Sequence, residues 1–255
     1  PETFVKTNVL GTLTLLNASK KSWETISGFK DGKKYVQIST DEVYGSLGTS
    51  GLFKDTTALD PHSPYSASKA AADMIVKSYF DTYRMPVNIT RCSNNYGPYQ
   101  FPEKLIPLVI NNCLKLESIP IYGNGSNVRD WLYVKDHCKA IDLIISSGII
   151  GHVYNIGGNN EKTNLEMVYT IINNLSSINK EISGKLITFV PDRKGHDKRY
   201  GIDSEKLKKE LGWYPETNFE EGIQKTVKWY LNNMDWMDSI TKGDYRDYYK
   251  LMYKA

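Results

Sequence analysis

Two small groups of residues have side chains suited to acid–base chemistry on a hydroxyl group. Thr40, Asp41 and Glu42 are three consecutive polar residues that follow a run of β-branched and aromatic residues. Tyr65 and Lys69 are four residues apart, so on a helix they lie on the same face. A lysine ammonium group beside a phenol stabilises the phenolate and lowers the pKa of the phenol. We therefore expect Tyr65 to act as an acid or base toward an alcohol.

The elements that must hold these groups are a strand and a helix. The run that begins at Tyr35 predicts a buried strand ending at the three polar residues. Ligands of open α/β sheets bind at the carboxyl ends of the strands, so these polar residues would face a pocket. Ser63 as N-cap, Pro64 as first helical residue and the alanine-rich residues 67–73 predict the helix. A tyrosine and lysine pair alone could be a solvated helix face, but the strand-end carboxylates favour a functional site.

Several longer motifs occur in order along the chain. Residues 39–45 read Ser-Thr-Asp-Glu-Val-Tyr-Gly, and residues 64–69 read Pro-Tyr-Ser-Ala-Ser-Lys. Four more motifs follow at residues 91–98, 101–107, 129–134 and 192–200. In these motifs, and over nearly its whole length, the chain resembles the extended short-chain dehydrogenase/reductase family, and within it the nucleotide-sugar 4,6-dehydratases.

The resemblance implies an α/β fold: a Rossmann-like doubly wound parallel sheet with a smaller α/β substrate-binding domain. Residues 1–100 would form the C-terminal part of the NAD-binding domain and carry the catalytic residues. Residues 101–255 would form mainly the sugar-nucleotide-binding domain, with some segments returning to the Rossmann sheet. In the family, the glycine-rich dinucleotide fingerprint comes before the helix that is predicted here for residues 1–22. We therefore expect the N-terminal half of the sheet to be absent from this sequence.

One glycine-rich stretch imitates that fingerprint. Gly45, Gly48 and Gly51 have the spacing Gly-x-x-Gly-x-x-Gly, and they follow the predicted strand. The residues after them are polar loop residues and Pro61, not a helix. Because a pyrophosphate site of this kind needs a helix N-terminus, we interpret the stretch as a flexible surface loop.

The family reaction is an internal redox elimination with NAD as cofactor, and the resemblance implies one step for each catalytic residue. Tyr65, kept anionic by Lys69, would take the proton of the C4 hydroxyl while Thr40 hydrogen-bonds that oxygen. Glu42 would remove the C5 proton, and a protonated Asp41 would give a proton to the leaving C6 hydroxyl. Neighbouring carboxylates can divide base and acid roles because like charges push their pKa values apart. Epimerases do not need an adjacent acid and base, so dehydration is favoured over epimerisation.

The ligand contacts are also implied by the resemblance. Arg129 and Arg193 would clamp the diphosphate of a dTDP-sugar substrate, because a guanidinium group donates two parallel hydrogen bonds. Lys194 stands where the family has a proline. Asn94 and its neighbour could instead be turn residues, and Asn164 could also cap a helix. The cofactor contacts are Tyr65, Lys69, Asn8 and Cys92, and the substrate contacts are Asn94, Lys104, Leu105, Pro120, Tyr122, Arg129, Asn164, Arg193 and His196.

Hydrophobic periodicity and turn residues predict the other elements. Strands are expected at residues 85–90, 119–122, 129–134, 153–156 and 185–190, and residues 91–102 are expected to be an ordered irregular loop. Helices are expected at residues 1–22 and 135–147, from near Asn164, and twice within residues 204–237. Asn218 with Glu221 forms a capping-box-like start of the last helix. The expected buried side of the helix at 135–147 is Ala140, Ile141, Ile144 and Ile145, and the expected packing aromatics are Trp229, Trp236 and the tyrosines near 245–253.

The composition excludes several kinds of protein. The chain has 255 residues, 40% of them hydrophobic, and a formal net charge of +3. This mixed charge gives no sign of nucleic-acid binding, and no run reaches the length of a membrane span. We expect no nucleic acid, no membrane and a cytoplasmic location. The three cysteines form no Cys-x-x-Cys pair and the four histidines lack metal-ligand spacing, so we expect reduced thiols and no metal.

The predicted helices at residues 4–22 and 63–84 carry apolar residues on more than one side, for example Ile75, Val76 and Tyr79. In the family these two helices pair with their copies, which implies a homodimer. Two other hypotheses stay open: a UDP-sugar 4,6-dehydratase or epimerase of the same family, and a truncated, non-catalytic sugar-nucleotide-binding protein. An exposed sheet edge, left by absent neighbouring strands, would also lower solubility.

Overall fold

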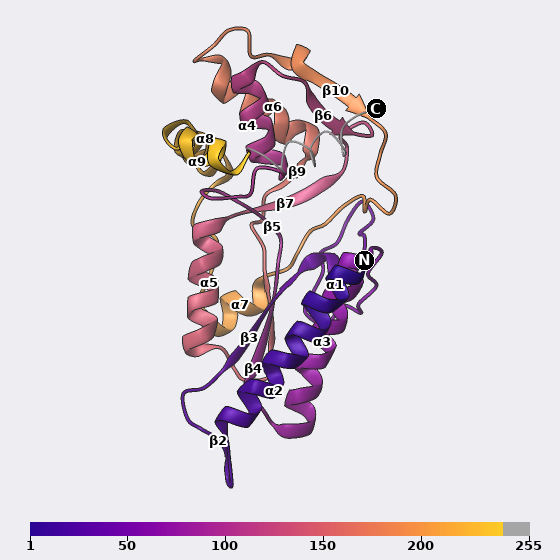
Figure 1. Cartoon of the computed structure of the whole chain (residues 1–255), viewed down its shortest axis with the longest axis vertical. Helices are drawn as coiled ribbons and strands as arrows, with labels where there is room; N and C mark the ends of the chain where they lie inside the picture. The colour runs from indigo at the N-terminus through magenta and orange to yellow at the C-terminus, as the bar shows by residue number, and fades with distance from the viewer. Residues whose placement is uncertain (242–255) are drawn as a thin grey trace.

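The computed structural model describes residues 1–241, which form a lower and an upper lobe in the view of Figure 1. The lower lobe is built on three parallel strands, β3 (Tyr35–Thr40), β4 (Val87–Cys92) and β8 (Val153–Ile156), in the order β3-β4-β8. β3 ends in buried residues, but Ile38 within it is 40% exposed, because in the described structure β3 pairs with β4 alone. The predicted α/β fold with parallel strands is confirmed.

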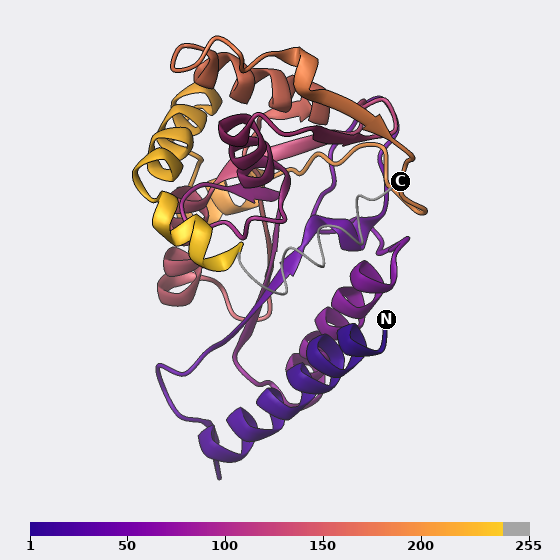
Figure 2. The same ribbon diagram turned by 45° about the horizontal axis from the view of Figure 1, so that its top comes forward.

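Helices cover both faces of this sheet (Figures 1 and 2). On one face lie α3 (Pro64–Tyr83) and the continuous helical run of α1 (Glu2–Phe4), the π-helical η1 (Val5–Leu10) and α2 (Gly11–Trp23). On the other face lie α5 (Val134–Ser147) and α7 (Glu205–Leu211). Two separate apolar clusters fill the two sides, one around Leu16, Val76 and Ile89 and the other around Ile144, Ile156 and Leu207.

The helix that carries Tyr65 and Lys69 begins and ends as its sequence requires. Ser63 is the N-cap of α3, and its hydroxyl accepts a hydrogen bond from the Ser66 amide at 3.1 Å while the Ser66 hydroxyl accepts one from the Ser63 amide at 3.0 Å. Pro64 occupies the first helical position, where a missing N–H costs nothing. The helix ends at Arg84, whose left-handed conformation stops the α-helical hydrogen bonds. The predicted helix is therefore confirmed.

The upper lobe holds two small sheets and four helices. Strands β5 (Asn94–Tyr96), β7 (Val128–Tyr133) and β9 (Glu161–Thr163) form one sheet, and β6 (Ile119–Tyr122) pairs in parallel with β10 (Ile187–Val190) in the other. A large apolar cluster around residues such as Tyr96 and Trp131 joins them to the helices. These helices are α4 (Leu105–Lys115), α6 (Asn164–Ser176), α8 (Phe219–Asn232) and α9 (Met234–Ile240). The remaining short elements are the hairpin of β1 (Glu24–Thr25) and β2 (Gly28–Phe29), and the 3-10 helices η2 (Asp41–Tyr44) and η3 (Gly184–Leu186).

Several segments pass between the lobes. β8 follows α5 and returns to the lower sheet, where Ile89 pairs with Val153. Residues 191–203 run from β10 down to α7, along the right side of Figure 1 and then across between the lobes. The end of β3, the start of α3 and these connections therefore meet between the lobes.

Some predicted boundaries are wrong. β4 starts at Val87, two residues later than predicted, because Pro86 has no N–H to donate to a ladder. The predicted irregular loop at 91–102 contains the end of β4 and the whole of β5. Asn94 and Asn95 are therefore strand residues paired with Trp131 and Leu132, and their alternative interpretation as turn residues is wrong.

Three other local predictions also need correction. Thr163, not Asn164, is the N-cap of α6, because the Thr163 hydroxyl accepts from the Glu166 amide and the Glu166 carboxylate accepts from the Thr163 amide. In α5, Ala140 and Ile144 are fully buried as predicted, but Ile145 is 51% exposed, because it lies beyond the helix face that packs on the sheet. As predicted, no helix follows the glycine-rich stretch 45–51.

The aromatic residues of the last helices pack together. The ring of Trp229 lies 4.6 Å from that of Tyr99 and 5.3 Å from that of Trp236, which confirms packing as their role. The tyrosines near 245–253 lie outside the described residues. Within residues 1–241, no helix has both the length and the apolar composition needed to cross a membrane.

Candidate active site

The carboxyl end of β3 delivers three polar side chains to one place. At Thr40 the chain turns into η2, and the Thr40 hydroxyl accepts a hydrogen bond from the Glu42 amide and donates one to Asp41 Oδ1, both at 3.3 Å. Asp41 is 2% exposed, and its second oxygen, Oδ2, is buried with no hydrogen-bond partner among residues 1–241. A buried oxygen without a partner requires an explanation, and a bound ligand group would supply one.

The environments of the two carboxyl groups differ. Burial raises the pKa of Asp41 well above its usual value, and the neighbouring Glu42 carboxylate raises it further. Burial also raises the pKa of Glu42, but the Arg129 guanidinium group opposes that shift. The structure therefore favours a protonated Asp41 beside a more readily ionised Glu42, the direction that the acid and base roles require.

Tyr65 lies beside these carboxyl groups. Burial, with a further contribution from the Glu42 carboxylate, raises the pKa of Tyr65 to about 12. The Lys69 ammonium group donates to the main-chain carbonyl of Ile38 at 2.5 Å, and burial lowers its pKa. The prediction that Lys69 lowers the pKa of Tyr65 is therefore wrong for the protein alone, since burial and the Glu42 carboxylate both disfavour the phenolate.

A buried interaction that the sequence alone did not predict connects the elements that carry these residues. Arg91 on β4 donates through Nε to the Asp73 carboxylate on α3 at 2.9 Å and through Nη1 to the Tyr44 hydroxyl at 2.9 Å. Tyr44 in turn donates to Asn155 on β8 at 2.8 Å. Arg91 is 5% exposed and Asp73 is 1% exposed, so the ion pair is buried. Its hydrogen bonds join α3, η2 and two strands in the interior. The available signal was a charged residue inside an apolar strand, which requires a partner.

The charges of the two proposed clamp arginines both act on Glu42. Arg129 is 7% exposed, and both Arg129 and Arg193 lower the pKa of Glu42. The Arg193 guanidinium group lies 4.8 Å from the centre of the Tyr122 ring and 3.1 Å from His196 Nε2. The structure therefore brings Arg193, Tyr122 and His196 together and leaves both arginines within electrostatic reach of Glu42.

Two predicted cofactor residues lie on the other elements around Tyr65. Asn8, in η1, donates through Nδ2 to the Ser68 hydroxyl on α3 at 2.9 Å. Cys92, at the end of β4, contacts the Ser39 carbonyl at 3.5 Å, and burial raises the pKa of its thiol to about 12. A thiol of this kind is neutral, so its role would be one of packing and shape.

The remaining predicted substrate residues lie in different surroundings. Asn94 has a buried side-chain oxygen with no partner among residues 1–241, and the charge of Lys104 reaches Glu42. Leu105 packs against the upper apolar cluster, and Pro120 is buried in β6 opposite Thr188. Asn164 donates its main-chain N–H to the Asn127 carbonyl at 3.0 Å.

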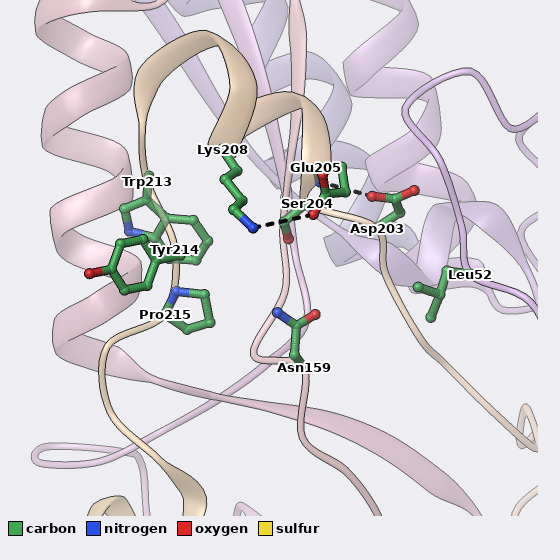
Figure 3. A pocket seen from close by; sticks show the side chains of 9 residues that line it. All are labelled: Leu52, Asn159, Asp203, Ser204, Glu205, Lys208, Trp213, Tyr214 and Pro215. Atoms are coloured by element: carbon green, nitrogen blue, oxygen red, sulfur yellow. Dashed lines mark hydrogen bonds and ion pairs between the residues drawn. The ribbon is translucent and has the colours of Figure 1, made fainter.

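A surface cavity at α7 contains none of these residues. This cavity of about 170 Å³ lies between Trp213 and Leu52 (Figure 3). Its lining also includes Ser204, Glu205 and Lys208, and the chemistry described above is elsewhere. The strand-end cluster is the better candidate site, because it joins perturbed pKa values to convergent polar groups. Among residues 1–241, no group of His, Cys, Asp and Glu side chains has a metal-binding arrangement.

Comparison with known proteins identifies the family. A family model described as GDP-mannose 4,6 dehydratase matches residues 1–226. A dTDP-glucose 4,6-dehydratase of Xanthomonas campestris pv. campestris is 50% identical over 251 residues, which are 96% of this chain and 72% of that protein. The chain belongs to the GDP-mannose 4,6 dehydratase family.

Solved structures agree with the family assignment. The dTDP-glucose 4,6-dehydratase of Bacillus anthracis str. Ames, in complex with NAD, superposes with a TM-score of 0.84 at 53% identity, over 92% of this chain and 71% of that chain. The enzyme of Streptomyces venezuelae, with NAD and TYD bound, has a TM-score of 0.85 at 43% identity, over 92% and 69%. The resemblance and the α/β fold inferred from the sequence motifs are therefore confirmed.

Proposed function

We propose that this protein is an NAD-dependent dTDP-glucose 4,6-dehydratase, a lyase that converts dTDP-glucose to dTDP-4-keto-6-deoxyglucose. The observation that carries the proposal is the adjacent pair Asp41 and Glu42 at the end of β3, where burial favours a protonated Asp41 and the Arg129 charge favours an ionised Glu42. This acid–base pair supports dehydration over the alternative epimerisation. Relatives of that name, one of them 50% identical, support the same reaction.

The residues around Tyr65 suit NAD as the cofactor. The Glu42 carboxylate raises the pKa of Tyr65, so a positive charge such as that of an oxidised nicotinamide ring would be stabilised there and would lower that pKa. Tyr65, Lys69, Asn8 and Cys92 are the residues that we propose to hold it. Bound NAD would supply the hydride acceptor for C4 and the hydride donor for C6.

The side chains of this chain divide the proton transfers. Tyr65, as phenolate, takes the proton of the C4 hydroxyl, and Thr40 hydrogen-bonds the same oxygen. The 4-keto group acidifies C5, and Glu42 removes that proton. Asp41, kept protonated by burial and by its neighbour, donates its proton to the C6 hydroxyl, which leaves as water.

The upper lobe and residues 192–196 would hold the sugar nucleotide. Arg129 and Arg193 bind the diphosphate, and their charges also stabilise the ionised form of Glu42. His196 and Tyr122 lie beside Arg193, and Asn94 contributes an amide oxygen that has no partner among residues 1–241. The other proposed substrate contacts are Lys104, Leu105, Pro120 and Asn164.

The domain division, the location and the pathway belong to the same proposal. The proposed division assigns residues 1–100 to the catalytic NAD-binding part, except that β5 pairs in the upper lobe, and residues 101–255 mainly to the substrate part, with α5, β8 and α7 returning to the sheet. The three free cysteines support a cytoplasmic location. A 4-keto-6-deoxy sugar would supply rhamnose-type deoxysugar biosynthesis.

We also propose a homodimer, formed by the outer face of the N-terminal helix and α3. Exposed apolar side chains on these helices support it, namely Phe4, Val5, Leu10, Leu15 and Met74. Val76 and Tyr79 are buried, and Ile75 packs on the lower apolar cluster, so these three residues belong to the core and do not support the interface.

The function is tested by incubating the purified protein with NAD+ and dTDP-glucose and measuring the alkaline absorbance of a 4-keto-6-deoxy product. A parallel reaction with UDP-glucose tests the alternative nucleotide. Product from dTDP-glucose at the higher kcat/KM supports the proposal. Product from UDP-glucose alone would favour the alternative dehydratase, and binding of dTDP without any product would favour a non-catalytic binding protein.

A further inference from the structure

Residues 191–203, which we call the crossing segment, are held between the two lobes. On one side, the Val128 amide at the start of β7 donates to the Lys198 carbonyl at 2.8 Å. On the other side, the Phe53 amide in the loop after η2 donates to the Gly201 carbonyl at 2.9 Å. The segment therefore fixes the upper lobe relative to the catalytic elements of the lower lobe.

Asp197 attaches the crossing segment to the start of α3. Its Oδ1 lies 2.6 Å from His62 Nδ1, and its Oδ2 accepts a hydrogen bond from the Tyr200 hydroxyl at 2.6 Å. His62 directly precedes Ser63, the N-cap of the helix that carries Tyr65. Both carboxylate oxygens of Asp197 are thus occupied in a setting where the residue is 8% exposed.

The main chain of the same residue holds a clamp arginine. The Asp197 carbonyl accepts a hydrogen bond from Arg129 Nη2 at 2.9 Å and another from Asn127 Nδ2 at 3.2 Å. The Arg129 guanidinium group also lies 4.3 Å from the centre of the Tyr200 ring. Asp197 therefore binds Arg129 through its main-chain carbonyl. Through its carboxylate it binds Tyr200, whose ring the Arg129 guanidinium group contacts.

The second clamp arginine is carried by the same segment. Arg193 and His196 precede Asp197 and contact each other at 3.1 Å, and His196 Nδ1 lies 2.6 Å from the Asp192 carboxylate. Arg193 is exposed, and its main-chain N–H donates to its neighbour, Asp192, at 2.8 Å. The position of this arginine relative to Tyr65 therefore depends on the anchor at Asp197.

We propose that Asp197 is a positioning residue for the diphosphate clamp: its carbonyl orients Arg129, and its carboxylate, through His62 and Tyr200, holds the segment with Arg193 against the start of α3. The inference rests on the proposed function in assigning a diphosphate to the two arginines. The anchoring of the segment does not depend on that assignment.

The test compares three variants of the whole chain. Asp197→Ala removes both side-chain contacts, whereas Asp197→Asn keeps an oxygen for the Tyr200 hydroxyl and an N–H for neutral His62. Asp136→Ala is the matched control, because Asp136 is 2% exposed and accepts a hydrogen bond from the Thr217 amide at 2.8 Å, away from the clamp. Two quantities are measured: the Kd for dTDP by calorimetry, and the rate of tryptic cleavage after Arg193 or Lys194 by mass spectrometry.

The expected result is a change in Asp197→Ala alone. Loss of one hydrogen-bonded contact to a charged group predicts about a tenfold higher Kd for dTDP and about tenfold faster cleavage. With dTDP-glucose, KM should rise while kcat changes less than threefold, and Asp197→Asn should restore most of the affinity. If the losses in Asp197→Ala came only from general destabilisation of the fold, Asp136→Ala would show the same losses.

Two other outcomes overturn separate claims. If Asp197→Ala binds dTDP and resists trypsin like the unchanged protein, the positioning role is wrong and the proposed function still stands. If the unchanged protein binds no dTDP, the proposed function and the clamp role fail together. The cleavage rates then decide by themselves whether Asp197 anchors the segment.

Discussion

Replacing Asp73 by asparagine should destabilise the fold far more than its place on the catalytic helix would suggest. Asp73 is 1% exposed and receives the Nε hydrogen bond of Arg91, which is itself 5% exposed. Asparagine keeps the shape of the side chain but removes its charge, and Arg91 keeps its positive charge in the interior. Breaking one side of a buried ion pair typically costs about 3–5 kcal/mol.

The lower end of that range applies here. Arg91 would still donate to the Tyr44 hydroxyl and lie 4.9 Å from the centre of its ring, and the new amide oxygen can still accept from Nε. We expect a loss of about 3 kcal/mol in the free energy of unfolding, which corresponds to a fall in Tm of about 6–12 °C for a protein of this size. Chemical denaturation at pH 7, followed by circular dichroism, measures the first quantity.

The control lies two turns further along α3. Asp81 accepts a hydrogen bond from Lys77 at 2.5 Å, and its side chain is 51% exposed. Asp81→Asn should therefore change the free energy of unfolding by less than about 1 kcal/mol. Equal losses in Asp73→Asn and Asp81→Asn would refute the claim that the buried network holds the catalytic helix in place.

Three further predictions concern the site, the pH dependence and the assembly. Glu42→Gln should lower kcat about 10²–10⁴-fold with little change in the Kd for dTDP, as expected for loss of a general base; unchanged turnover would exclude Glu42 as that base. Asp197 raises the pKa of His62, so the stabilising contribution of His62 is complete below about pH 6.5 and is lost as pH rises through the raised value. His62→Gln should accordingly lower the free energy of unfolding more at pH 6 than at pH 8.5, and a pH-independent loss would contradict this assignment. Leu15→Glu should convert the dimer to monomers in sedimentation velocity whereas Ile150→Glu should not, and a dimer that persists in Leu15→Glu would place the interface elsewhere.

The local parts of the site were predictable because their causes lie within a few residues. The apolar run before Thr40 predicts a strand, and Ser63 followed by Pro64 predicts the start of a helix wherever it packs. The spacing of Tyr65 and Lys69 then determines that both residues face the same side. The structure has this strand and this helix at the residues predicted for them.

Properties set by distant residues were not predictable. The pKa of Tyr65 depends on where the ammonium group of Lys69 points, and that group binds the Ile38 carbonyl of another element. The contact between Arg91 and Asp73 joins a strand to a helix. Spacing along the chain gives no information about such a contact.

The role of Asp197 was hidden for the same reason. Its partner His62 is far away in the sequence, and the two meet only because the crossing segment returns from the upper lobe. The N-cap of α6 was misplaced by one residue, because β9 ends at Thr163 and so sets where the helix begins. Tertiary contacts therefore decided the features that local patterns left open.

The most direct test of the proposed reaction follows one hydrogen. The protein is incubated with NAD+ and dTDP-glucose that carries deuterium at C4, and the product is examined by proton NMR. An internal redox elimination with Tyr65, Glu42 and Asp41 in their proposed roles predicts a 4-keto-6-deoxy sugar with the deuterium in its C6 methyl group. Deuterium retained at C4 of an epimerised or unchanged sugar would contradict the dehydratase assignment.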